Sequence, residues 1–95
     1  KTKIVFIAIK PSPSRWKLKD RVVKANALIE QYCSTDKRLS YADIYTPMLG
    51  ADGLPRRELF IKDMLHLSPE GYDLWTSIVK PHLQVRKVTA PATRR

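Results

Sequence analysis

Residues 3–9 read KIVFIAI, and the expected fold class follows mainly from this run. Its β-branched and aromatic side chains favour a strand, and apolar and polar positions do not alternate along it. A strand of this kind is typically buried on both faces, as in a parallel sheet that helices cover on both sides. We therefore expect an α/β protein, with a loop over residues 10–14 where Pro11 and Pro13 end the strand.

The next segment, residues 18–32, has apolar side chains at alternating steps of four and three, which predicts a helix. Asn26 lies off that stripe and is expected to face solvent, whereas Cys33 ends the apolar face and is expected to be a small buried residue. Residues 39–45, LSYADIY, form a second and shorter strand candidate. Strand, helix and strand in this order predict a βαβ unit with parallel strands.

Beyond the second strand the sequence predicts a long loop and a last helix. Asp43 could bond to the loop backbone or serve as a carboxylate behind a functional site, and residues 46–57 form the loop, with a turn at Asp52-Gly53. Ser68 is a predicted helix N-cap, followed by a proline at the first helical position. The apolar stripe of the helix over residues 69–83 comprises Leu74, Trp75, Ile78 and Val79.

Asp63 precedes His66 by three residues, just ahead of that helix start. One turn of backbone at this separation brings a carboxylate under an imidazole ring. A carboxylate bonded to one ring nitrogen fixes the tautomer and leaves the other nitrogen available as a general base. The alternative is a structural histidine near the start of the helix.

A substrate pocket is expected beside this pair, because ligands of parallel α/β sheets bind at the carboxyl ends of the strands. The loop after the first strand places Pro11, Ser12 and Trp16 at that edge, and Leu65 adjoins His66. Trp16 could wall the pocket or only pack the loop onto the following helix.

Residues 60–75, together with the upstream run over residues 4–13, resemble the C-terminal part of the SGNH (GDSL-type) hydrolases. The resemblance extends over residues 3–83. It implies a three-layer α/β/α, flavodoxin-like fold, of which residues 1–83 would be the C-terminal βαβα part. It also implies that Asp63 and His66 are the acid and base of a serine esterase triad that acts on acyl or acetyl esters of small molecules, lipids or glycans, and no cofactor is expected. A metal site is not expected either, because the sequence has only two histidines and no H-E-x-x-H motif or cysteine cluster.

The family's other catalytic elements are not found in the sequence, which lacks a Gly-Asp-Ser nucleophile block and a Gly-x-Asn-Asp block. We therefore expect that a preceding half, in the same polypeptide or in another chain, completes both site and sheet, and that the chain alone is inactive and can self-associate. An α/β sheet of two strands is marginal by itself. The alternative is a small basic α/β binding module without catalysis.

Charge is unevenly distributed along the 95 residues, whose net charge is +9. Residues 1–24 hold eight basic side chains and one acidic one, and residues 84–95 hold four basic and no acidic side chains. No nucleic-acid recognition motif accompanies the charge, so specific nucleic-acid binding is not expected. Residues 84–95 lack an apolar period and are expected to be a disordered basic tail. The longest apolar run is far too short to span a bilayer.

Overall fold

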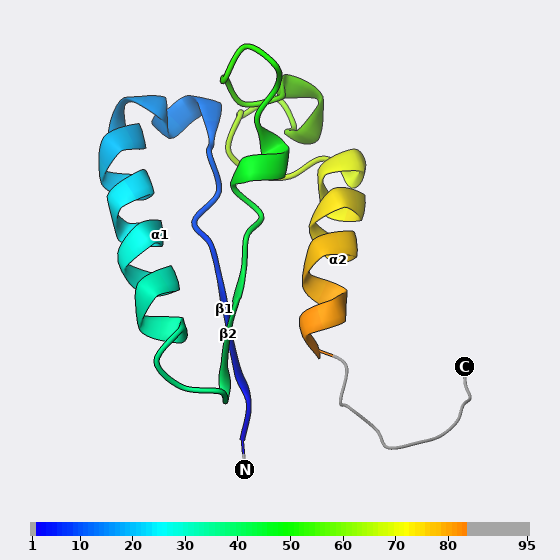
Figure 1. Cartoon of the computed structure of the whole chain (residues 1–95). Coiled ribbons are helices and arrows are strands. Elements are labelled where there is room, and N and C mark those ends of the chain that lie inside the picture. Colours follow the sequence, from blue (N-terminus) through cyan, green and yellow to red (C-terminus); the bar gives the residue numbers. More distant parts are fainter. Residues whose placement is uncertain (1, 84–95) are drawn as a thin grey trace, which may run out of the picture.

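The computed structural model describes residues 2–83, which form a mixed α/β structure around a two-stranded parallel sheet (Figure 1). Strand β1 (Ile4–Ile7) pairs with strand β2 (Leu39–Ala42), which confirms the α/β class and the parallel βαβ unit. The tail predicted over residues 84–95 lies outside the described residues.

Two helices flank the sheet on opposite sides in Figure 1. Helix α1 (Lys19–Cys33) connects the strands, and helix α2 (Pro69–Leu83) follows the last loop with the bounds that the sequence predicts. Three short 3₁₀ helices, η1 (Pro13–Leu18), η2 (Thr46–Met48) and η3 (Arg57–Leu59), lie in the connections. They lie in stretches that the sequence alone predicts to be loops or helix ends.

The first strand is shorter than predicted because the backbone of Ile9 bonds to a helix side chain instead of a strand. The Asn26 side chain on α1 accepts a hydrogen bond from the Ile9 N–H at 2.9 Å and donates one to the Ile9 carbonyl at 3.1 Å. Asn26 is therefore buried, only 6% exposed, and the prediction that it faces solvent is wrong. Its amide takes the place that a neighbouring strand would have.

Asn26→Ala is expected to lower the free energy of unfolding by about 2 kcal/mol, because it leaves a backbone donor and acceptor of Ile9 without their partner. Urea denaturation of the chain measures this change. Lys24→Ala, at an exposed position of the same helix, is the control and should stay within about 0.5 kcal/mol of the wild type. Equal midpoints for the two variants would show that the Asn26 bonds contribute nothing net.

The second strand also ends early, at Ala42, because Asp43 turns the chain. Its Oδ1 accepts hydrogen bonds from the N–H groups of Tyr45 and Thr46, at 3.0 and 3.1 Å. Of the two roles open to Asp43, the structure therefore shows bonding to the loop backbone. The loop beyond it carries the predicted turn, with Gly53 at a φ of 78°.

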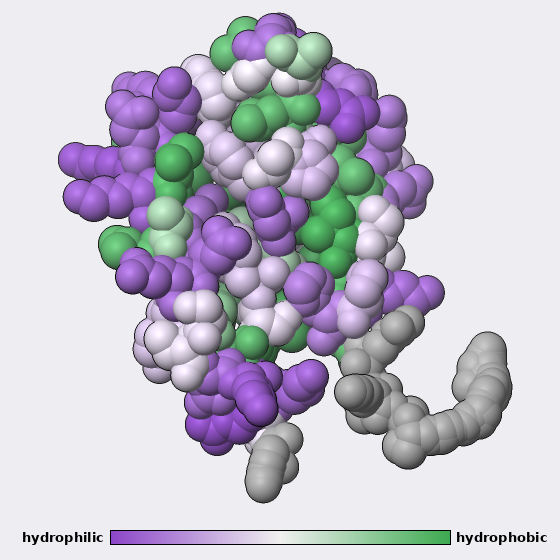
Figure 2. All heavy atoms as spheres, viewed as in Figure 1, coloured by the Kyte–Doolittle hydropathy of each residue, from purple (hydrophilic) through white to green (hydrophobic). Residues whose placement is uncertain are grey.

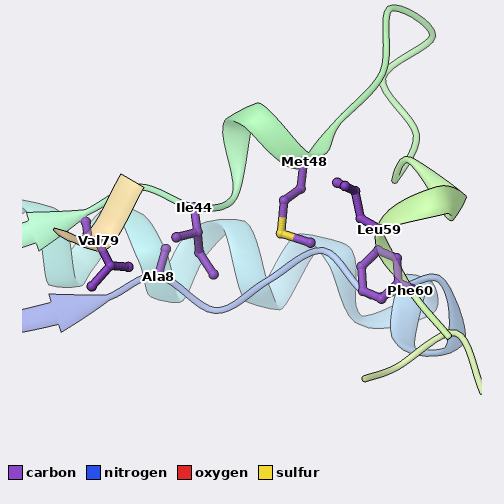
Figure 3. Close-up of a cluster of buried hydrophobic side chains, with 7 residues drawn as sticks. Ala8, Ile44, Met48, Leu59, Phe60 and Val79 are labelled. Carbon is purple, nitrogen blue, oxygen red and sulfur yellow. The ribbon is translucent and has the colours of Figure 1, made fainter. Parts of the chain in front are cut away.

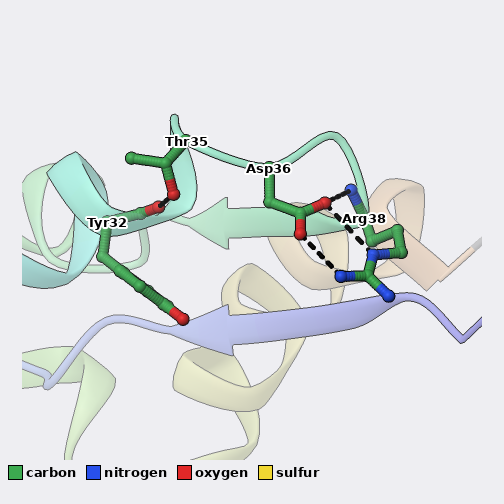
Figure 4. A network of polar contacts seen from close by, with 4 residues as sticks. All are labelled: Tyr32, Thr35, Asp36 and Arg38. Atoms are coloured by element: carbon green, nitrogen blue, oxygen red, sulfur yellow. Dashed lines mark hydrogen bonds and ion pairs between the residues drawn. The ribbon is translucent and has the colours of Figure 1, made fainter.

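The turn between α1 and β2 is closed by side chains (Figure 4). The Asp36 carboxylate accepts bonds from the Arg38 backbone N–H at 2.8 Å and from the Arg38 guanidinium at 2.7 Å. Thr35 donates its hydroxyl to the Tyr32 carbonyl at 2.7 Å. The side-chain bond from Arg38 and the bond from its backbone lower the pKa of Asp36 to about 2. Cys33, just before this turn, is buried as predicted.

The core lies between the sheet, helix α2 and the loops before it (Figure 3). Met48 and Leu59, from η2 and η3, are each only 1% exposed, so the long connection contributes to the core and does not merely span it. The other buried members are Ala8, Ala42, Ile44, Phe60 and Val79. The predicted stripe of α2 packs on this cluster through Leu74, Trp75, Ile78 and Val79.

The prediction that β1 is buried on both faces is wrong, because one neighbouring strand and two helices cannot cover it. Ile4 is 47% exposed and Ile7 40%. Figure 2 shows hydrophobic surface exposed among hydrophilic residues on one side of the molecule. Within the described residues β1 pairs with β2 only. A further strand or a second chain on this edge stays a prediction. No helix within residues 2–83 is long and apolar enough to cross a membrane.

Candidate functional site

Asp63 and His66 lie in a closed loop that runs from Phe60 to Leu67. The Ile61 N–H donates to the His66 carbonyl at 2.9 Å, and a bridge joins Phe60 to Leu67. Inside the loop, Met64 has a φ of 55°, a left-handed conformation that costs a non-glycine residue about 1 kcal/mol. The Met64 N–H donates to the Ile61 carbonyl at 2.9 Å, so the loop's own bonds hold this conformation.

The carboxylate of Asp63 binds His66 at two places. Its Oδ2 lies 2.6 Å from the Nδ1 of the His66 ring. Its Oδ1 accepts hydrogen bonds from the backbone N–H groups of Leu65, at 2.9 Å, and of His66, at 3.0 Å. The ring and its own backbone are therefore tied to one carboxylate, which favours a proton on Nδ1 and leaves Nε2 as the acceptor.

The pair is open to solvent, since the side chain of His66 is 67% exposed and that of Asp63 is 43% exposed. The bond from the His66 ring, followed by those from the backbone of His66 and Leu65, lowers the pKa of Asp63 to about 2. Because the pKa is lowered on folding, any stability that the carboxylate contributes is present above its ordinary pKa of 3.8 and is lost as the pH falls through about 2. At neutral pH Asp63 is ionised.

The start of helix α2 anchors this loop to η3. The Ser68 hydroxyl accepts a hydrogen bond from the Gly71 N–H at 3.1 Å, which confirms Ser68 as the N-cap. The same hydroxyl donates a hydrogen bond to the Glu58 carbonyl at 2.8 Å. The Ser68 N–H also donates to the Leu59 carbonyl at 2.9 Å. Gly71 is buried, and a Cβ there would lie 2.1 Å from the Leu59 carbonyl oxygen. Only glycine allows this approach of helix and loop.

His66 lines a cleft of about 590 Å³ at the carboxyl ends of the strands. The residues that follow β1, Ile9 to Ser12, form one wall, and Ile44 and Tyr45 after β2 also contribute. The Ser14 N–H donates to the Met64 carbonyl at 3.0 Å and so joins the loop after β1 to the loop of the Asp63–His66 pair. The volume is within the usual range for sites that bind small molecules.

Comparison of the chain with protein families, with curated proteins and with solved structures gives no match. The site is therefore described by its own geometry. The structure brings together all four residues predicted for the pocket, because Pro11, Ser12, Trp16 and Leu65 line the cleft beside His66. Their contact with a substrate stays a prediction. Trp16 contributes to the cleft wall, and the Lys19 Nζ lies over its ring, 5.5 Å from the ring centroid.

The other histidine of the chain takes part in a contact that sequence reasoning missed. His82, in the last turn of α2, places its Nδ1 2.5 Å from the Ser40 hydroxyl on β2. The two residues are 42 positions apart, so no local spacing could have indicated this contact. His82 is not part of the cleft lining and serves to tie α2 to the sheet. Within residues 2–83 no group of three or more His, Cys, Asp and Glu side chains could hold a metal ion.

Proposed function

We propose that residues 1–83 are the C-terminal part of a serine esterase of the SGNH (GDSL-type) family, whose complete domain has a three-layer α/β/α, flavodoxin-like fold. The observation that carries the proposal is the 2.6 Å contact between Asp63 Oδ2 and the Nδ1 of His66, which lines the cleft. The parallel pair β1–β2, the helix on either side of it and the position of the cleft at the carboxyl ends of the strands agree with that architecture.

In this proposal His66 moves the protons and Asp63 holds the ring. Ionised Asp63 accepts the Nδ1–H bond, so Nε2 is the basic nitrogen and takes a proton from a serine hydroxyl as the oxygen attacks the ester carbonyl. Asp63 stabilises the imidazolium that forms. The ring then returns the proton to the departing alcohol, and a water molecule activated in the same way releases the acid. The substrate is an acyl or acetyl ester.

The serines beside the pair are not suited to be the nucleophile. The Ser68 hydroxyl is engaged by Glu58 and Gly71, and Ser12 has no hydrogen bond to His66. The proposal therefore assigns the nucleophile and the oxyanion donors to a segment beyond these 95 residues, in the same polypeptide or in a second chain. That segment would also pair with the exposed edge of β1.

The pure chain is expected not to hydrolyse p-nitrophenyl acetate above background, because a base without a nucleophile and an oxyanion site gives little acceleration. The product of the complete reading frame should hydrolyse the ester and react with a fluorophosphonate probe at a serine outside residues 1–95. If the chain alone turns over the ester and His66→Ala abolishes this turnover, the nucleophile lies within this chain. A complete product that neither turns over nor labels would favour the alternative, a non-catalytic basic α/β binding module.

A further inference from the structure

The cleft beside His66 is lined by charges of one sign. Lys10, Arg15 and Lys19 contribute to its lining, and no aspartate or glutamate does. Among residues 2–83 none of the three cations takes part in an ion pair. Three carboxylates lie beside the lining but not in it. Asp63 is bonded to His66, Asp43 accepts the backbone N–H of Tyr45 at 3.0 Å, and Asp20 adds to the raised pKa of Tyr45, of which burial is the larger cause. A cleft with cations on a wall of low polarity concentrates anions.

The same cleft offers apolar surface and one buried hydroxyl group. Its apolar lining includes Ile7, Ala8, Val22, Leu67 and Trp75. Ser12 is only 5% exposed, and its hydroxyl makes no hydrogen bond with any described residue, although its backbone N–H and carbonyl bond to Lys10 and Arg15. A buried hydroxyl without a protein partner is expected to meet water or a ligand atom.

We propose that this cleft binds an anionic amphiphile, a molecule with an apolar chain and one carboxylate or phosphate group. The apolar part lies on Ile7, Leu67 and Trp75, and the anionic group is held by Lys10 and Arg15 together with the Ser12 hydroxyl. Binding does not depend on hydrolysis. If the proposed function is taken as its basis, this inference also specifies the substrate class: an ester whose non-reacting part carries a negative charge.

Both tryptophans of the chain, Trp16 and Trp75, line the cleft, so tryptophan fluorescence reports binding directly. The probes share one chain length and differ in the head group: octanoate, octyl phosphate, octanol and octyltrimethylammonium. The two anions are expected to bind at least about tenfold more tightly than octanol or the cation, and to weaken as salt screens the charges. The tighter of the two anions identifies the head group as carboxylate or phosphate.

Lys10→Ala combined with Arg15→Ala should weaken octanoate binding by about tenfold or more, and Ser12→Ala should weaken it by a smaller factor. Lys24→Ala combined with Lys37→Ala removes two exposed cations outside the cleft and is the matched control, with unchanged affinity. Equal affinity for octanoate and octanol, or equal losses in the two double variants, would overturn the proposal. None of the four probes carries a carboxylic ester, so binding is measured without hydrolysis. A catalytic test that fails leaves this result standing, and failed binding leaves the catalytic test valid.

Discussion

Asp63→Asn is expected to lower kcat by about 10⁴ in the product of the complete reading frame, with the fold intact. The fold should persist because asparagine keeps an oxygen at Oδ1, where Asp63 accepts the N–H groups of Leu65 and His66. The loss arises at the other oxygen, 2.6 Å from Nδ1. An amide there carries no negative charge to stabilise the imidazolium, and its NH₂ group can hold the ring in the wrong tautomer.

Asp43→Asn is the matched control for this change. Asp43 also uses Oδ1 to accept the N–H groups two and three residues later, on Tyr45 and Thr46, but it has no histidine partner. The control should keep kcat within about twofold, since it perturbs the same kind of turn without touching the proton transfer. Steady-state kinetics and thermal midpoints of both variants make the comparison. If Asp63→Asn shifts the midpoint while kcat stays at the wild-type value, Asp63 is a loop-capping residue.

Gly71→Ala is expected to destabilise the chain by about 3 kcal/mol, the largest stability change that we predict. The added Cβ would lie 2.1 Å from the Leu59 carbonyl oxygen, and this contact involves backbone that cannot rotate away. Alanine is the better helix former by up to about 1 kcal/mol, so the clash must exceed that gain. The thermal midpoint should fall by roughly 15 °C. The Ser68 cap should also shift and carry His66 with it.

Gly53→Ala separates the clash from the general effect of replacing a glycine. Gly53 has a φ of 78°, and an added Cβ would meet nothing within 4 Å. Its cost is the left-handed conformation alone, about 1 kcal/mol. Calorimetry of both variants should therefore give the larger loss at Gly71. A smaller loss at Gly71 than at Gly53 would mean that α2 can move away from η3 at little cost.

The elements that local chemistry specifies could be predicted from the sequence. Ser68 and Pro69 define the start of α2, and its apolar stripe defines the buried face, so the predicted bounds of that helix agree with the structure. The Asp63–His66 contact was predictable for the same reason, because three residues of spacing and one turn fix its geometry. The order of strand, helix and strand along the chain indicated the parallel pairing of β1 with β2.

The features that depend on distant residues could not be predicted. Asn26 has the periodicity of a solvent-facing position, but its amide replaces a strand at Ile9, 17 residues away. The left-handed Met64 has no sequence signal, since the loop's hydrogen bonds impose its conformation. The convergence of Lys10, Arg15 and Lys19 on one cleft follows from the path of the chain through η1 and α1. Such features arise from tertiary contacts and not from local propensity.

If His66 is the base of an esterase, the two histidines of the chain should differ sharply in their effect on catalysis. The measurement is kcat for p-nitrophenyl acetate in the product of the complete reading frame, for the wild type, His66→Ala and His82→Ala. His66→Ala should lose at least about 10⁴ in kcat, because the variant lacks the imidazole that takes the serine proton in this mechanism. His82→Ala removes the bond to Ser40, outside the cleft, and should lower stability while leaving kcat near the wild-type value. A His66→Ala variant that keeps the wild-type kcat would show that His66 is not the catalytic base.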